Sequence, residues 1–429
     1  MDGSGDRTGR ARQRALQDRT LRTRARIVDG AVAVLAQAGV AGLTHRAVAK
    51  AAGVSLAATT YHFATKADIL AETSRVQLAG YLDAFRRFGG RLREDGEGIG
   101  SLDDLVLRVV LNALGRERTR SLAWLELALH GGRSRDGRAL AQAWYGELDA
   151  IWADIGARLQ AAPSPYEAGA AVDRAIGLTF LLQPLAPGEA AARDLLTGAT
   201  DIARLAAAEA MAPSPAAAEA GPAAAGEARR RIVEAAIGIL IEEGAGAISH
   251  GAVAKRAGMA RSGPSYHFPT IGALMRTAQM ALFERAKARY RVGFGTLPPA
   301  EIGEARLIDV TTAIYFREVL EFAHENIGYH SVWLSAARDA ELRPAVLASL
   351  LDQHRAWLRR LAAIPGAAPS PGTPSPAMPS PAGPLMLQAV FVGKLIRALA
   401  AGATTAELSR ARDDFAAAIA AALGRPGNV

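Results

Sequence analysis

The fold is decided by residues 44–66, which read THRAVAKAAGVSLAATTYHFATK. Thr44 is an N-cap residue for a helix of about two turns, because its side chain can accept a hydrogen bond from a free amide of the first turn. Gly53 supplies the conformation that ends this helix. Ser55 can cap a next helix that runs to about His62. The stretch therefore predicts two short helices joined by a tight glycine turn.

The flanks of this stretch predict two more helices. Before it, apolar residues recur at helical spacing, at Ile27, Ala31, Leu35 and Ala38. Gly39 ends this first helix, and Thr65 followed by Asp68 resembles a capping box for a fourth. A longer helix that braces two short ones is typical of a helix-turn-helix, whose third helix can enter a major groove. An ordinary α-hairpin in a helical bundle has the same spacing, so the spacing alone leaves both interpretations open.

The same pattern occurs twice in the chain. Residues 24–70 align with residues 229–275 at a constant offset of 205, without a gap. The matches include His45 with His250, and Tyr61-His62-Phe63 with Tyr266-His267-Phe268. A shared alanine bias cannot explain matches in Gly, His, Tyr and Phe. We therefore expect two units of about 205 residues, a period too long for a solenoid.

The positive charge is concentrated in the two copies. The chain has a formal net charge of +8 and a pI near 10.0. Residues 1–75 hold twelve Lys or Arg against six Asp or Glu, and residues 226–290 hold ten against five. Cations that face DNA gain free energy by releasing condensed counterions. Repetition and charge together favour DNA reading over an ordinary hairpin.

These residues resemble a known family. Gly53-Val54-Ser55, followed by Tyr61-His62-Phe63-Ala64-Thr65-Lys66, resembles the signature of TetR-family bacterial transcriptional regulators, and Thr44-x-x-x-Val48-Ala49-x-x-Ala52-Gly53 is similar to that family's second helix. Residues 249–268 are a degenerate version of the same signature. The resemblance implies an all-α fold of two tandem units. Each unit would be a three-helix helix-turn-helix DNA-binding domain followed by a helical effector and dimerisation domain.

The resemblance also implies which side chains meet DNA. Thr44 and Arg46 would touch a phosphate or a base edge, and Lys66 would pair with a phosphate. The recognition face of the first copy is small and apolar, so it would read thymine methyls and groove shape. The full set of expected DNA-binding residues is Thr44, His45, Arg46, Leu56, Ala57, Ala58, Thr60, Tyr61, His62, Lys66, Ser249, His250, Arg261, Ser262, Ser265, Tyr266 and His267.

The second copy departs further from the family pattern. Both copies have a small hydroxyl residue, Thr60 or Ser265, where the family usually has Tyr. In the second copy Ile271 replaces the lysine, and Gly263-Pro264 falls in the third helix, which should therefore begin late. We expect this copy to bind DNA more weakly or to be mainly structural, with Arg261 and Ser262 as its DNA-facing side chains.

The chain divides at composition changes. We expect an arginine-rich arm and first helix-turn-helix at 1–70, a helical effector domain at 71–210, an Ala/Pro linker at 211–226, a second helix-turn-helix at 227–276, and a second effector domain at 277–429 with a disordered proline-rich loop at 363–384. The arm is either a minor-groove reader or a disordered solubilising tail. The family forms its dimer interface with the last two helices of each unit, which here match residues 171–207 and 385–423.

Aromatic and histidine side chains in the effector halves are candidates for ligand pockets, as the family implies. They are Trp124, His130, Trp144 and Tyr145 in the first half, and His324, Tyr329, His330 and Trp333 in the second. For any single one of them, we favour an ordinary core position over a ligand contact.

Several other classes of protein are excluded by what the sequence lacks. It has no cysteine, so disulfides, thiolate metal sites and cysteine nucleophiles are absent. It has no phosphate loop, dinucleotide fingerprint or nucleophile elbow. Residues 1–26 are polar and arginine-rich, unlike a secretory signal. We expect no enzyme activity, cofactor, metal or membrane partner, and a cytoplasmic protein that lies at the nucleoid when DNA is bound.

The sequence thus predicts a sequence-specific transcriptional regulator, by default a repressor, that binds a double-stranded operator and is modulated by a small ligand. The tandem units would act as a single-chain pseudo-dimer. One alternative is a homodimer that reads DNA with the first helix-turn-helix only, the second unit being a sensing or interaction module. Another is a nucleic-acid-binding protein without sequence preference.

Overall fold

The protein is described by a computed structural model that covers residues 4–94, 99–159, 165–205, 223–295, 303–364 and 382–424. The first half of the chain forms α1 (Ser4–Gly42), α2 (His45–Ala52), α3 (Leu56–His62), α4 (Lys66–Glu94), α5 (Leu102–Leu114), α6 (Arg118–Gly131), α7 (Arg135–Leu159), α8 (Pro165–Leu182) and α9 (Glu189–Thr197). Most of the predicted linker, and the proline-rich loop from 365 to 381, lie outside the described residues.

The second half is also helical. It forms α11 (Ala223–Glu242), the short helix η1 (Ala245–Ala247), α12 (His250–Ala257), α13 (Gly263–His267), α14 (Ile271–Gly295), α15 (Glu304–Leu320), α16 (Ala323–Ala336), α17 (Arg343–Ala362), α18 (Gly383–Ala401) and α19 (Thr405–Ala422). No strand occurs among the residues that the structure describes, so the expected all-α class is confirmed.

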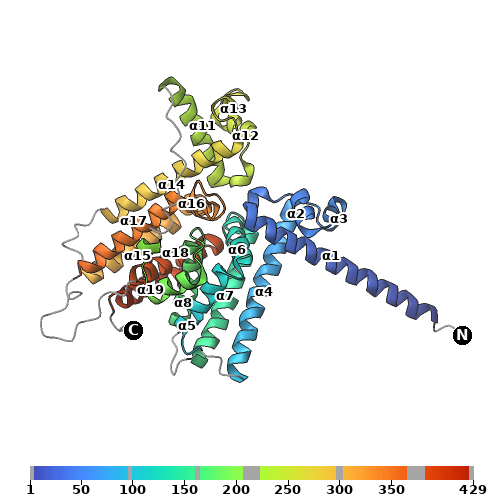
Figure 1. The fold of residues 1–429 in the computed structure, drawn as a ribbon, viewed down its shortest axis with the longest axis horizontal. Coiled ribbons are helices and arrows are strands. Elements are labelled where there is room, and N and C mark those ends of the chain that lie inside the picture. The colour runs from blue at the N-terminus through green and yellow to red at the C-terminus, as the bar shows by residue number, and fades with distance from the viewer. Residues whose placement is uncertain are drawn as a thin grey trace.

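The first helix is longer than its apolar spacing predicts. It begins at Ser4 and projects from the body of the molecule towards the N-terminus (Figure 1). The arginine-rich arm is therefore a helix in this structure, and the expectation of a disordered tail is wrong. At its other end the helix is broken at Gly39, whose φ of +62° is a conformation that favours glycine. The predicted end of the first helix is thus close to the observed one.

Two small heads stand on a larger helical body (Figure 1). The first head has its own core, built mainly from α1, α2 and α4, with Ile27, Leu35, Val48, Phe63 and Ile69. The second head is built from α11, α12 and α14 around Ile232, Ile237, Val253, Phe268 and Leu274. Burying one such side chain stabilises a fold by roughly 1.5–3 kcal/mol, so each head has enough apolar contacts to hold its short helices in place.

The body is organised around α8 and α18, which pack side by side and share one core with the surrounding helices. α7 contacts both of them, α5 lies against α8, and α19 lies against α18. Two segments, Gln17–Gly42 and Gly383–Ala401, are long and apolar enough to cross a membrane by length and composition. The apolar window of Gly383–Ala401 is 94% buried inside the protein, so a core position accounts for its hydropathy.

Glycines bring α8 and α18 into backbone contact. A β-carbon at Gly177 would lie 1.9 Å from the carbonyl oxygen of Ala389, and one at Gly393 would lie 1.7 Å from that of Asp173. Gly393 follows Gly177 by 216 positions, and Ala389 follows Asp173 by the same number. The two contacts are therefore equivalent, and any larger side chain at either glycine would force the helices apart.

A buried ion cluster crosses the same contact. Arg397 of α18 donates to Asp173 of α8 at 2.8 Å and to Asp149 of α7 at 2.7 and 3.0 Å. Lys394 pairs with Asp173 at 3.3 Å and with Asp414 of α19. Burial alone would lower the pKa of Lys394, but the two carboxylates outweigh it and the pKa is raised. The lysine therefore stays charged inside the protein.

Two arginines connect the body to the heads. Arg133, just after α6, donates to the carbonyl oxygen of Leu240 in α11 at 3.2 Å. Arg338, just after α16, donates to the carbonyl oxygen of Leu35 in α1 at 3.2 Å and also pairs with Glu126. Arg338 follows Arg133 by 205 positions, and Leu240 follows Leu35 by the same number. Each arginine thus bonds to a head helix of the opposite half of the chain.

Candidate DNA interface and ligand cavity

The first helix-turn-helix is set up by local side-chain caps. The Thr44 hydroxyl accepts from the Ala47 amide at 3.1 Å, and the Ser55 hydroxyl accepts from the Ala58 amide at 3.1 Å. Gly53 lies between the two helices with φ of +62°. Each cap satisfies a backbone donor that a helix start leaves free. The predicted caps and turn are therefore all observed, and they fix where α3 begins.

Arginines of α1 hold this unit together, a role that the sequence analysis missed. The Arg26 guanidinium donates to the carbonyl oxygens of Ala52 at 2.9 Å and Gly53 at 2.7 Å, where α2 ends. A cation is favourable at a helix C-terminus because of the helix dipole. Arg24 lies 4.8 Å from the Phe63 ring centroid and pairs with Glu72 at 3.4 Å. Arg24 is thus a packing residue rather than part of a free arm.

Most of the expected DNA-binding side chains of the first copy are available at the surface. The exposed ones are Thr44, Arg46, Leu56, Ala57, Thr60 and Tyr61, and the half-buried ones are His45, Ala58, His62 and Lys66. Tyr61 is 84% exposed, and its ring meets the His62 ring edge-on with centroids 5.1 Å apart. The Thr60 hydroxyl is bonded to carbonyl oxygens of its own helix. The free surface of α3 is therefore small, apolar and flanked by an aromatic ring.

Two of the predicted contacts have internal roles. The Lys66 ammonium donates to the carbonyl oxygen of Val40 at 2.6 Å, and burial lowers its pKa. It closes the break at the end of α1, so reaching a phosphate would require it to leave this bond. The pKa of His62 is lowered by burial and by the Arg24 charge, which favours a neutral ring.

The second head repeats the caps but not the recognition helix. Ser249 accepts from the Ala252 amide at 3.1 Å, and Gly258 has φ of +62°. α13, in contrast, starts at Gly263 without a side-chain cap and includes Pro264 in its first turn. Its late start agrees with the sequence prediction, and it leaves a helix of five residues.

The predicted DNA-binding residues of this head differ in accessibility. Ser249, Arg261, Ser262, Ser265 and Tyr266 are exposed, whereas His250 and His267 are half-buried. The His250 ring lies 2.8 Å from the carbonyl oxygen of Phe268, so its ring nitrogen has a structural partner. Arg231 donates to the Ala257 carbonyl at 2.6 Å, which matches Arg26 in the first head. The scaffold of the head is therefore kept while its reading surface is shortened.

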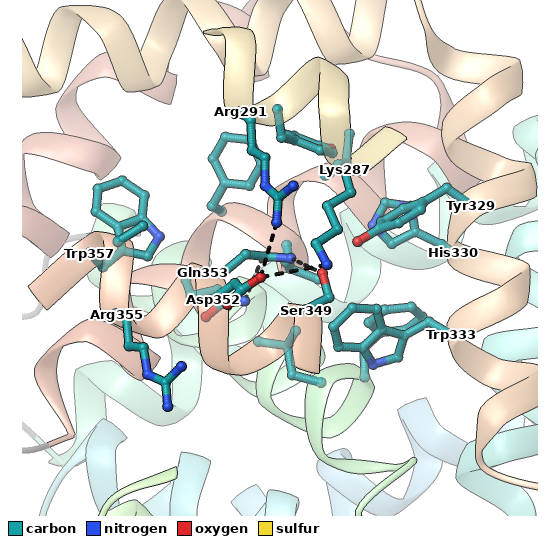
Figure 2. Close-up of a pocket in the computed structure, with 18 of the residues that line it drawn as sticks. Lys287, Arg291, Tyr329, His330, Trp333, Ser349, Asp352, Gln353, Arg355 and Trp357 are labelled. Carbon is teal, nitrogen blue, oxygen red and sulfur yellow. Dashed lines mark hydrogen bonds and ion pairs between the residues drawn. The ribbon is translucent and has the colours of Figure 1, made fainter. Parts of the chain in front are cut away.

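A cavity of about 450 Å³ lies in the second half, between α14, α16, α17 and α18 (Figure 2). Three of the predicted ligand residues, Tyr329, His330 and Trp333, line it. Phe180 and Leu181 of α8 complete one wall, although they belong to the first half of the chain. The volume is within the usual range for small-molecule pockets.

His330 is neutral in this environment. Its Nδ1 lies 2.7 Å from the carbonyl oxygen of Asn326, and burial lowers its pKa to about 4. Nδ1 therefore carries the proton and donates it to that carbonyl, and the ring is uncharged at neutral pH. Phe180 lies beside the ring, with centroids 5.3 Å apart.

The polar lining of the cavity was not predicted. Lys287 and Arg291 of α14 point towards Asp352 of α17, at 3.5 and 3.2 Å (Figure 2). Gln388 of α18 donates to Gln353 at 2.7 Å. These residues lie on three separate helices, and those of α14 and α17 have the spacing of an ordinary solvated face. A sequence signal existed only for Gln388, which interrupts an apolar run.

The predicted pocket residues of the first half have a different setting. Trp124, Trp144 and Tyr145 pack in one aromatic cluster that leaves gaps of about 40 and 70 Å³. The Trp144 indole donates to the Leu78 carbonyl at 3.0 Å, and Tyr145 lies under Arg397 at 4.8 Å. His130 and His324 line neither the large cavity nor these gaps. The structure thus brings three of the eight predicted residues together around a cavity of ligand size.

Comparison with known proteins agrees with the geometry of the first head. The family model described as "Bacterial regulatory proteins, tetR family" matches residues 27–73. A solved structure, the multidrug binding protein EbrR complexed with imidazole, is 32% identical over 45% of this chain and 96% of that chain, with a TM-score of 0.29. No curated protein matches. Residues 27–73 of the chain therefore carry a DNA-binding domain of the tetR family of bacterial regulatory proteins.

Proposed function

We propose that this protein is a sequence-specific DNA-binding transcriptional regulator that reads its operator mainly with α3. The observation that carries the proposal is the capped, exposed face of α3 within a TetR-family domain. Thr44 and Arg46 stand at the start of α2, where they can bind phosphate, while Leu56 and Ala57 face outward for apolar contact with bases. A domain of this kind is regulatory, and we propose that the protein has no enzyme activity and acts in the cytoplasm.

The two halves of the chain act as a single-chain pseudo-dimer. Support comes from contacts that occur twice with the halves exchanged, Arg133 to Leu240 and Arg338 to Leu35. In a two-fold dimer, residue i contacts residue j, and the partner's residue j contacts residue i. The glycine contacts between α8 and α18 follow the same rule. A family built on two-fold dimers therefore has its counterpart here within one chain.

The ion cluster favours this internal pairing over a homodimer. Lys394 and Arg397 lie 216 positions after Leu178 and Leu181, so only the second half has cations at these places. Two first halves packed together would bury Asp173 against leucines. Two second halves would bury four cations with only the two Asp414 carboxylates to pair with them. An uncompensated buried charge costs several kcal/mol, so the unlike pairing is the stable one.

The heads are expected to contribute unequally to DNA binding. α3 has seven residues and two caps around it, whereas α13 has five residues and a proline. Arg261 and Ser262 remain exposed beside α13 and can still reach a groove or a phosphate. We expect the operator to have unequal half-sites, about 34 Å apart along the DNA.

The cavity is the proposed ligand-binding site of the regulator. Helix α16 connects this cavity to the first head. Tyr329 and Trp333 line the cavity on this helix, and Arg338 follows its end and bonds to the Leu35 carbonyl of α1. A ligand that shifts α16 would therefore move a contact of the DNA-reading head. We propose that the protein represses transcription and that ligand binding relieves this repression.

The test is selection of bound sequences from random duplex DNA with the full-length protein at fixed salt, with a mass measurement of the free protein. We expect one site with unequal halves and a mass near the 44.8 kDa of one chain. Arg46→Ala should weaken binding to that site by about tenfold and Arg261→Ala by less, because the first head is the main reader. The reverse order would show that the dominant head was assigned wrongly.

Other outcomes point to the alternatives. A symmetric palindrome with a mass near 90 kDa, about twice that of one chain, would favour a homodimer that reads with the first head only. Binding that falls steeply with salt but selects no site would favour a nucleic-acid-binding protein without sequence preference.

A further inference from the structure

We propose that the cavity between α14, α16, α17 and α18 binds one amphipathic aromatic anion, such as an aryl carboxylate, per chain. The inference rests on the proposed function as a ligand-responsive regulator and specifies the chemistry of its ligand. Three features of the cavity lead to it: flat aromatic walls, an excess of cations, and buried polar atoms without partners.

The walls suit a planar ring. Phe180 and Trp333 are stacked with centroids 6.0 Å apart, and Tyr329 meets Trp333 edge-on at 6.3 Å. Trp357 and Phe391 line other parts of the cavity. Aromatic rings favour offset stacking or edge contact with another ring, and they bury a large apolar area. A ligand with one or two fused rings therefore fits this lining and the volume of about 450 Å³.

The charges select an anion. Five cationic side chains line the cavity, Lys287, Arg291, Arg355, Arg359 and Arg360, against the single carboxylate of Asp352. That carboxylate is already paired with Lys287 and Arg291. Arg355 and Arg359 are exposed and have no acidic partner in the part of the chain that the structure describes. The field at the cavity thus attracts a carboxylate and repels an ammonium group.

Buried polar atoms call for a further partner. Trp333 and Gln388 are each 2% exposed, yet the indole N–H and the Gln388 Oε1 have no hydrogen bond among the described residues. The Gln388 amide nitrogen is held by Gln353, which in turn donates to Ser349 at 3.1 Å. The chain of amides fixes Gln388 in place, so its free oxygen is presented in a set orientation. Buried polar atoms are normally satisfied. The Trp333 N–H can donate to a ligand carboxylate, whereas the Gln388 oxygen needs a donor such as a hydroxyl or N–H elsewhere on the ligand.

One ligand per chain follows from the contrast between the halves. The aromatic cluster around Trp124 and Trp144 leaves only the gaps of about 40 and 70 Å³, too small for a ring system. Of the five cations of the large cavity, only Arg291 has a cationic counterpart 205 positions earlier, Arg86, and that residue lines neither gap. The second half is therefore the half that senses this ligand.

The experiment uses three probes with the same ring and different charge: naphthalene-1-acetate, the neutral naphthalene-1-acetamide, and the cationic 2-(1-naphthyl)ethylamine. Isothermal titration of the full-length protein, without DNA, gives affinity and stoichiometry. We expect the acetate to bind at one per chain and about tenfold more tightly than the acetamide, with the amine weakest. The difference between acetate and acetamide should narrow in about 0.5 M salt, because Arg355 and Arg359 are exposed.

A double variant separates charge selection from packing. Arg355→Gln with Arg359→Gln should weaken acetate binding by about fivefold and leave acetamide binding unchanged, since the cavity walls are intact. Arg306→Gln, an exposed arginine of α15 that does not line the cavity, is the matched control and should change neither. Equal affinity for acetate and acetamide, tighter binding of the amine, or no binding of any probe would overturn the inference. Operator binding is not part of this readout, so the proposed regulator function can fail or survive independently.

Discussion

Replacing Gly177 or Gly393 with alanine tests the closest contact between the two halves of the chain. In a solvated helix, a glycine-to-alanine change stabilises by about 1 kcal/mol, because alanine has the higher helix propensity. At these two positions the new β-carbon would lie 1.9 Å from the carbonyl oxygen of Ala389 or 1.7 Å from that of Asp173. We therefore expect the sign of the effect to be reversed.

The size of the effect follows from those distances. A carbon atom and an oxygen atom without a bond need roughly 3.3–3.5 Å, so α8 and α18 would have to separate by about 1.5 Å. Overpacking of this kind costs about 1–3 kcal/mol, which exceeds the gain in propensity. Each single variant should thus lose about 1–2 kcal/mol and melt a few degrees below the wild type.

Both clashes are relieved by the same separation of the helices. Once Gly177→Ala has moved α18 away, Gly393→Ala should cost less than it does alone, so the double variant should lose less than the sum of the two. Such coupling is expected for paired contacts across one interface. Two independent defects in a core would instead add.

The assay is thermal unfolding followed by tryptophan fluorescence, with Gly169→Ala as the matched control on the same helix. A β-carbon at Gly169 would meet nothing within 4 Å, so this variant should be neutral or slightly stabilised. If Gly177→Ala and Gly393→Ala also raise the melting temperature, the close approach of α8 and α18 is refuted. The pseudo-dimer would then lose one of its three supports.

Three further predictions concern buried groups. Arg338→Met should leave binding of naphthalene-1-acetate unchanged but reduce the effect of this probe on operator binding, whereas Arg133→Met should leave that effect intact. If both variants reduce the effect equally, α16 is not the connection between the cavity and the first head. His330 has a folded pKa of about 4 against 6.5 when unfolded, so the unfolded state binds more protons between these values. Stability is therefore lost as the pH is lowered through this window, by up to about 3 kcal/mol. His330→Gln should reduce that loss in urea unfolding compared at pH 7 and 4.5. Asp173→Asn should lower the free energy of unfolding in urea by about 3–5 kcal/mol, because two buried cations lose an acid. The exposed control Asp194→Asn should change it by almost nothing, and equal unfolding midpoints for the two variants would count against the ion cluster.

The DNA-binding head could be predicted because its signals are local. The caps at Thr44 and Ser55 bond to amides three residues away, and the conformation of Gly53 is set by its own backbone. Each element therefore depends on a few neighbouring residues that can be recognised in the sequence. Lys66 is the exception, since its bond to Val40 joins residues that the local pattern does not relate.

The cavity could not be predicted because it exists only between helices. Lys287 and Arg355 stand on faces that are typical of solvated helices, and only the packing of α14 against α17 and α18 brings them to one cavity. Tyr329 and Trp124 occupy equivalent positions of the repeat, 205 residues apart, yet Tyr329 lines a cavity and Trp124 packs in an aromatic cluster. Aromatic composition therefore identifies candidates, and the volume between the helices decides among them.

The ion cluster shows what the repeat itself could have revealed. Lys394 and Arg397 are the only charged residues of α18, and cations in such an apolar helix require buried acids nearby. The sequence of α18 does not say where those acids are. The positions 216 residues earlier, however, are Leu178 and Leu181, so the two halves differ at the places where two identical partners would be alike. A difference of this kind implies that acids of the opposite half take part, and Asp173 and Asp149 are there, beside Asp414 of the same half. The chain thus encodes its pairing by making the two sides of one interface unlike.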